Sequence, residues 1–138
     1  MTPVLLDTGV IVALLDRSER HHRACVEAVE SSRALLVTWE AVIAESCYLM
    51  RHLAGAAEAI VLNVTSGVFQ IPVQLSRRSA QIERILHKCR DREIDFADAY
   101  LIDLAGEFRT GDILTLDRDF LIYRWGARRP FNPLVPLE

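Results

Sequence analysis

The chain has 138 residues, 51% of them hydrophobic and 25% charged, with a formal net charge of −3, which is typical of one globular domain spanning residues 1–138. The negative charge excludes a protein that binds nucleic acid through overall positive charge, so any site for a polyanion must be a local patch. Because no apolar run reaches the roughly 18 residues of a transmembrane helix and the first residues lack the basic segment of a signal peptide, we expect a cytoplasmic protein without membrane contact.

Strand-like and helix-like patterns alternate from one end of the chain to the other. In chain order they are a strand at 3–7, helices at 8–16 and 20–32, a strand at 34–38, helices at 39–53 and 55–66, a strand at 68–73, helices at 76–90 and 96–108, a strand at 112–117 and a helical turn at 118–123. Pro72 interrupts the third of these strands, which favours an edge position. Strands that alternate with helices predict a three-layer α/β/α sandwich with a central, mostly parallel sheet. Prolines punctuate the remaining tail.

The cysteines and histidines form no ligand pattern. The three cysteines, Cys25, Cys47 and Cys89, are far apart in sequence and lie in apolar-periodic segments. We therefore expect reduced thiols that pack in the core, without a disulfide framework or a zinc site.

Four acidic residues in distant segments point to one edge of the predicted sheet. Asp7 ends the first predicted strand and Asp117 ends the fourth, so both are expected at the carboxyl edge, where open α/β sheets bind ligands. Asp98 falls in the first turn of the helix that precedes the fourth strand. Glu45 falls about two turns into the helix that follows the second strand. The sequence thus predicts that four carboxylates converge at this edge.

Each of these acids also has a simpler explanation. Asp7 and Asp117 are suitable helix caps, and Asp98 can complete a capping box with Asp95. Glu45 can be an ordinary exposed helix residue. Apolar segments flank Asp7 and Asp117 on both sides, however, which a cap does not require. Carboxylates gathered at one edge repel one another unless a cation lies between them, and oxygen ligands without His or Cys favour Mg²⁺ or Mn²⁺.

The acidic segments resemble a known family. The runs VLLDTGVIVALL, VTWEAVIAES, IDFADAYLIDLA and ILTLDRDF follow one another in the order and spacing of PIN-domain nucleases, and the chain resembles in particular the VapC-type toxins of bacterial and archaeal toxin–antitoxin pairs. The HHRA stretch is also typical of them, and the resemblance covers nearly the whole chain. It implies a compact α/β/α fold and a metal-dependent endoribonuclease that hydrolyses RNA phosphodiester bonds with activated water.

The resemblance also implies roles for individual residues. The catalytic and metal-binding acids would be Asp7, Glu45, Asp98 and Asp117, with Asp119 as a secondary metal ligand. Thr8 and Thr115 match hydroxyl positions beside the acids, where they would orient a carboxylate or a water molecule. Alternatively, Thr8 is part of a helix cap and Thr115 is a strand-forming residue. The implied cofactor is Mg²⁺ or Mn²⁺. The implied partners are an RNA substrate, a cognate antitoxin that covers the active groove, and a second copy of the chain in a homodimer.

Two groups of basic residues are candidates for RNA binding. The first is a stripe along the helix at 76–90, opposite its apolar face: Arg77, Arg84 and Lys88. A solvated helix face is the simpler explanation of this stripe. The second is the tail YRWGARRPF, where arginines alternate with aromatic residues: Arg124, Arg128 and Arg129 with Tyr123, Trp125 and Phe131. Arginine with aromatics suits single-stranded RNA, whereas an edge strand packed by its own aromatics is the alternative. Arg118, beside Asp117, is the basic residue best placed to reach a scissile phosphate.

Apolar residues at 60–68 exceed the needs of a short peripheral helix: Ile60, Val61, Leu62, Val64 and Val68. They are expected in a subunit contact or in the core. Three other functions remain open. A phosphoryl-transfer hydrolase with an aspartyl nucleophile is disfavoured, because position 9 is glycine and lacks the second acid that this chemistry uses. The others are a PIN-like RNA-binding or scaffold subunit without nuclease activity, and a PIN nuclease of RNA maturation outside toxin–antitoxin systems.

Overall fold

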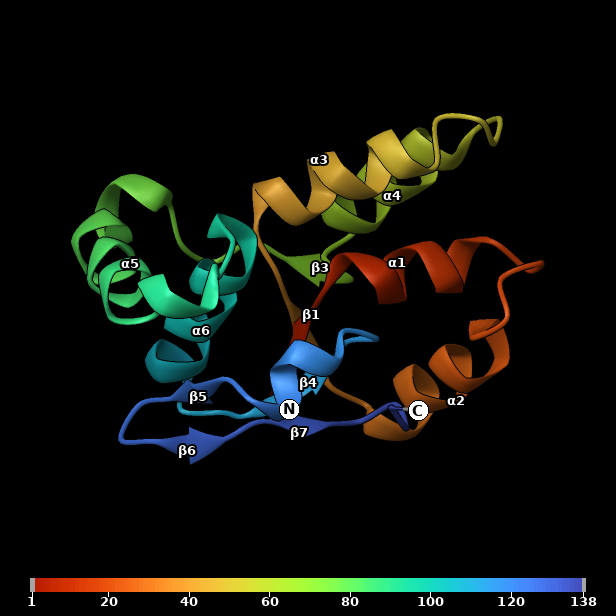
Figure 1. The fold of residues 1–138 in the computed structure, drawn as a ribbon. Helices are drawn as coiled ribbons and strands as arrows, with labels where there is room; N and C mark the ends of the chain where they lie inside the picture. Colours follow the sequence, from red (N-terminus) through yellow and green to blue (C-terminus); the bar gives the residue numbers. More distant parts are fainter. Residues whose placement is uncertain (1, 138) are drawn as a thin grey trace.

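A five-stranded sheet forms the centre of the molecule, for which a computed structural model describes residues 2–137 (Figure 1). The strands lie in the order β3-β2-β1-β4-β7, and each neighbouring pair is parallel. Their bounds are Pro3–Leu6 for β1, Leu35–Val37 for β2, Phe69–Gln70 for β3, Asp112–Leu114 for β4 and Asn132–Pro133 for β7. β3 is an edge strand, as the proline two residues beyond it predicts.

Six α-helices flank the sheet, which confirms the predicted three-layer α/β/α architecture. Their bounds are Thr8–Leu15 for α1, His22–Ser32 for α2, Glu40–Leu49 for α3, Ala56–Thr65 for α4, Leu75–Lys88 for α5 and Phe96–Phe108 for α6. α1 packs against α2 and α3, α3 packs against α4, and α5 packs against α6. Figure 1 shows α5 and α6 on one side of the molecule and α2 on the opposite side. Within residues 2–137, no helix is long and apolar enough to cross a membrane.

The strands are apolar because helices cover both faces of the sheet. Val4, Leu5 and Leu6 are all buried, although successive strand side chains point to opposite faces. Tyr100 of α6 is fully buried and stacks on Trp39 with ring centroids 4.0 Å apart. The three cysteines are free thiols, as the sequence predicts.

The strand predicted at 112–117 is shorter than expected, because β4 ends at Leu114. The hydroxyl of Thr115 accepts a 3.0 Å hydrogen bond from the backbone N–H of Asp117. Such a local hydrogen bond competes with the ladder of a sheet and turns the chain away from it. Asp117 is therefore not the last residue of a strand; it caps the 3₁₀ turn η2, Arg118–Leu121.

The tail contains more regular structure than the single edge strand that the sequence offers as an alternative. β5, Arg124–Trp125, pairs with β6, Arg129–Pro130, as an antiparallel hairpin, and β7 then adds a parallel edge strand to the main sheet. A Cβ at Gly111 would lie 2.5 Å from Nε1 of Trp125 and 2.9 Å from the carbonyl oxygen of Pro130. The hairpin therefore packs against the start of β4 only because position 111 has no side chain.

Candidate active site

Asp7 lies directly after β1, at the carboxyl edge of the sheet. Its backbone N–H donates to the carbonyl of Leu114 (3.0 Å), which joins the ends of β1 and β4. Asp7 as a whole residue is only 9% exposed. Oδ1 accepts from the backbone N–H of Thr8 (2.8 Å), and Oδ2 accepts from the Thr115 hydroxyl (2.7 Å). Asp7 thus caps α1, as the simpler explanation of this residue predicts. It is also a buried carboxylate that accepts a hydrogen bond on each of its two oxygens.

Three more carboxylates meet next to this edge. Asp98, Asp117 and Asp119 each offer an oxygen within 4.8 Å of the others. Asp98 is buried in the first turn of α6, where its backbone N–H donates to Oδ1 of the N-cap residue Asp95 (2.8 Å). The Tyr123 hydroxyl donates to Oδ2 of Asp98 (3.4 Å). Asp119, expected only as a secondary ligand, thus lies in the same group as two of the four predicted acids.

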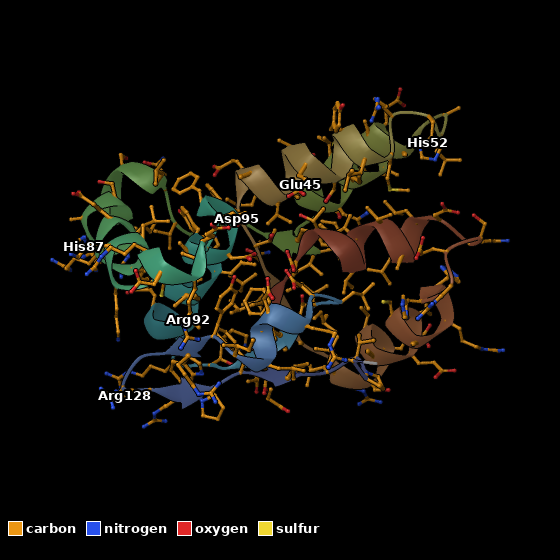
Figure 2. The ribbon with its side chains drawn as sticks, in the orientation of Figure 1. Glu45, His52, His87, Arg92, Asp95 and Arg128 are labelled. Atoms are coloured by element: carbon orange, nitrogen blue, oxygen red, sulfur yellow. The ribbon has the colours of Figure 1, made fainter. Side chains whose placement is uncertain are left out.

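Glu45 reaches the same edge from α3. It is exposed, and its Oε2 accepts a 3.2 Å hydrogen bond from the Thr8 hydroxyl. The Thr8 hydroxyl therefore bonds to a carboxylate instead of capping the helix. The Thr115 hydroxyl also bonds to a carboxylate, that of Asp7. Figure 2 labels Glu45 and Asp95 and shows oxygen atoms gathered between the first turns of α1 and α6.

The carboxylates repel one another. Burial raises the pKa of Asp98 to about 8, and like charges nearby add to the shift: Asp95, Asp7 and Asp117. Burial also raises the pKa of Asp7, against the hydrogen bonds from Thr115 and Thr8, and the charges of Asp117 and Glu45 raise it further. The structure therefore brings all four predicted acids into one electrostatic environment. Carboxylate and hydroxyl oxygens are also the donors that hard divalent cations prefer, so this set of residues fits such an ion.

Only part of the basic stripe on α5 lines a cleft. Arg84 and Lys88 line a cleft of about 810 Å³, together with Ile85 of the same helix. Arg77 is exposed and does not line this cleft. Arg118 is exposed on η2, beside Asp117.

The tail arginines are also divided. Arg124 and Arg128 line the same cleft, whereas Arg129 lies over the Trp125 ring, 5.5 Å from its centroid. Three aromatic side chains of the tail are buried: Tyr123, Trp125 and Phe131. These rings therefore pack inside the molecule and do not form an exposed stacking platform, whereas RNA binding by the tail arginines stays a prediction.

Two features of the site have no clear signal in the sequence. Tyr123 bonds to Asp98 although the two are 25 positions apart. Arg92 lies in the 3₁₀ turn η1, Arg90–Arg92, and lines the cleft. Neither residue belongs to a periodic pattern that would assign it to a face.

Comparison with known proteins places this chain beside PIN-domain ribonucleases. A sequence model of the PIN domain matches residues 4–125. Ribonuclease VapC26 of Mycobacterium tuberculosis is 34% identical over 117 residues, which cover 83% of this chain and 87% of that protein. The crystal structure of M. tuberculosis VapC20, described as a toxin that cleaves the sarcin–ricin loop, matches with a TM-score of 0.76 and 21% identity. That match covers 92% of this chain and 99% of VapC20, and it bears on the fold alone.

Proposed function

Because this chain belongs to the PIN domain family, we propose that it is an endoribonuclease and the toxin of a toxin–antitoxin pair. The observation that carries the proposal is the convergence of Asp7, Glu45, Asp98 and Asp117 at one edge of the sheet. The name of the relative with 34% identity, a ribonuclease, supports RNA as the substrate. The tail strand β7 completes the same sheet, which supports one domain over residues 1–138.

A divalent cation, Mg²⁺ or Mn²⁺, is the proposed cofactor. Asp98, Asp117 and Asp119 would hold it, because their oxygens lie within 4.8 Å of one another, and Asp7 and Glu45 would complete the acidic site. Such an ion lowers the pKa of water and neutralises the charge that develops on the phosphate.

The other side chains of the site hold the acids in place. Thr115 and the backbone of Thr8 fix both oxygens of Asp7, and the Thr8 hydroxyl orients Glu45. The Tyr123 hydroxyl orients Asp98. Groups positioned before the substrate arrives need no reorganisation during the reaction. Arg118 is the proposed contact of the scissile phosphate, and its exposed position beside Asp117 supports this role.

A cognate antitoxin and a homodimer are the proposed protein partners. An exposed apolar surface on α3, α4 and the loop between them supports a subunit contact. Its residues are Tyr48, Leu49, Leu53, Val61 and Leu62. Of the apolar residues expected in such a contact, Ile60 is fully buried and belongs to the core, while Val68 is exposed. An RNA substrate and an antitoxin partner are consistent with the cytoplasmic location that we expect from the sequence.

Cleavage of purified transfer RNA by the purified chain tests the nuclease proposal. We expect cleavage with Mg²⁺ or Mn²⁺, loss of cleavage in EDTA, and recovery when excess divalent ion is returned. Binding of RNA without cleavage of transfer or ribosomal RNA would instead support the scaffold function. A DNA-binding antitoxin encoded by a neighbouring gene would separate the toxin from a nuclease of RNA maturation.

A further inference from the structure

A basic cleft of about 810 Å³ lies between α5, α6 and the β5–β6 hairpin. Cationic side chains dominate its rim: Arg78, Arg84, Lys88, Arg92, Arg124 and Arg128. Two carboxylates, those of Asp103 and Glu107, also line it. Both pair with Arg78, at 2.8 Å and 3.2 Å. The other five cations line the cleft without a further carboxylate among its described lining residues. The cleft is therefore positively charged, although the net charge of the chain is −3.

The floor of the same cleft is apolar. Ile85 of α5, Ile102 of α6 and Ile122 after η2 line it, together with the Tyr123 ring. A nucleotide has a flat, weakly polar base and a charged phosphate, and it therefore matches an apolar floor with a cationic rim. The volume is within the range of pockets that enclose a small-molecule ligand.

The cleft adjoins the acidic site. A smaller cavity of about 280 Å³ is lined by Asp119, Arg92, Ile122 and Tyr123, and the last three of these residues also line the larger cleft. The Tyr123 hydroxyl bonds to Asp98. Figure 2 shows Arg92 and Arg128 on the side of the molecule formed by α5, α6 and the hairpin. A chain that crosses the carboxylates can therefore continue into the cleft.

We propose that this cleft holds the single-stranded RNA nucleotides next to the scissile phosphate and determines which RNA is cleaved. This inference rests on the proposed nuclease function. Arg84, Lys88 and Arg128 contact the phosphates, while the exposed side chain of Ile122 contacts one base. Single-stranded RNA is required because a base enters such a cleft only when it is splayed out of its stack.

Binding of RNA in EDTA tests the phosphate contacts without cleavage. The probe is a fluorescent single-stranded RNA of roughly 12 nucleotides, similar in length to the strands that nucleic-acid-binding domains cover. Anisotropy gives Kd over a range of salt concentrations. The Arg84→Gln/Lys88→Gln variant should weaken binding by about tenfold and reduce the salt slope by about 1.4, since each lost phosphate contact contributes about 0.7 for a single strand.

The matched control is Arg17→Gln/Arg23→Gln, which removes the same charge from the α1–α2 connection and α2, on the opposite side of the molecule (Figure 1). The control should change Kd by less than about twofold, because its charges are not phosphate contacts. Equal losses in both double variants would overturn the inference. Unchanged RNA binding together with lost inhibition by the antitoxin would make the cleft a protein-docking site instead.

The base contact needs a second comparison. Ile122 lines the cleft, whereas its neighbour Leu121 does not, and both side chains are about half exposed, so alanine at either position should leave the fold intact. Four RNAs that differ only in the nucleotide beside the cleaved bond are compared, and the measured quantity is the ratio of the fastest to the slowest cleavage rate among them. Ile122→Ala should change this ratio by about threefold or more, and Leu121→Ala should not. An unchanged ratio in Ile122→Ala would place the base elsewhere.

The two proposals fail in different ways. If no metal-dependent cleavage is found but only the Arg84/Lys88 variant weakens RNA binding, the nuclease proposal is refuted. The proposal of an RNA-binding cleft then remains. Metal-dependent cleavage with unchanged Kd in that variant would refute the cleft and keep the nuclease.

Discussion

The Thr115 hydroxyl donates a buried 2.7 Å hydrogen bond to Oδ2 of Asp7, across 108 positions of sequence. This contact joins the ends of β1 and β4 through their side chains, in addition to the backbone hydrogen bond from Asp7 to Leu114. The same hydroxyl accepts from the backbone N–H of Asp117. One side chain therefore positions two of the proposed catalytic acids.

Thr115→Val should destabilise the chain by about 1–3 kcal/mol, because valine keeps the shape and leaves the buried Asp7 with one hydrogen bond fewer. Urea denaturation in EDTA measures this change. Thr65→Val is the matched control, since the Thr65 hydroxyl is exposed on α4 and bonds only to the carbonyl of Val61. Equal free energies of unfolding for the two variants would show that the Thr115 contact does not stabilise the site.

The metal-free chain should become less stable as pH rises from about 4 to about 8. The pKa of Asp98 is raised to about 8 in the folded chain, whereas an unfolded Asp titrates near 3.9. The folded state then binds more protons than the unfolded state in this interval, so stability falls with rising pH. Asp98→Asn removes the titrating group and should flatten the profile. Unfolding free energies in EDTA at pH 5 and pH 8 measure the difference; parallel profiles would contradict the raised pKa.

Arg78 should be needed for stability, because it is the partner of a buried carboxylate. Its Nε and Nη2 donate to the two oxygens of Asp103, at 2.9 Å and 2.8 Å, and Asp103 is only 5% exposed. Arg78→Met should cost about 3 kcal/mol, since it leaves a buried carboxylate without its partner. Arg78→Met/Asp103→Leu should recover much of this loss. A double variant as unstable as the single variant would show that Arg78 acts by packing and not by pairing.

Position 111 should tolerate no side chain. Gly111→Ala brings a Cβ within 3 Å of Trp125 and Pro130, and forced overpacking costs about 1–3 kcal/mol. Gly106→Ala is the contrasting variant, because nothing lies within 4 Å of the added Cβ inside α6. It should stabilise the chain by up to about 1 kcal/mol, as alanine is the better helix former. Thermal denaturation should shift the two melting temperatures in opposite directions.

The sequence predicts the helices and four of the five strands of the main sheet well because their signals are local. The helix predicted at 96–108 has the bounds of α6, and the Asp95 cap that starts it is visible in the sequence. The tail strands are different, because each has only two residues and two of the three, β6 and β7, include a proline. Such short segments have no periodicity. They are strands only because β5 pairs with β6 and β7 pairs with β4.

The candidate site is partly visible in the sequence. Acids at strand ends and in first helical turns can be assigned to one edge, and Asp7 and Asp98 lie there. The contacts between Thr8 and Glu45 and between Tyr123 and Asp98 depend on how helices pack, so no spacing predicts them. The basic cleft combines two stripes predicted separately, on α5 and in the tail, with Arg92. Only the packing of the hairpin against α5 and α6 brings them together.

The most direct test of the proposed nuclease is cleavage of total transfer RNA by wild type and by Asp98→Asn. Asparagine keeps the shape of Asp98 and removes a negative charge that a divalent cation needs. Asp91→Asn is the control, because Asp91 is exposed on η1 and has no place in the acidic site. We expect metal-dependent cleavage by wild type and Asp91→Asn, and a loss of about a hundredfold or more in Asp98→Asn. Full activity in Asp98→Asn would contradict the assignment of the acidic edge as the active site.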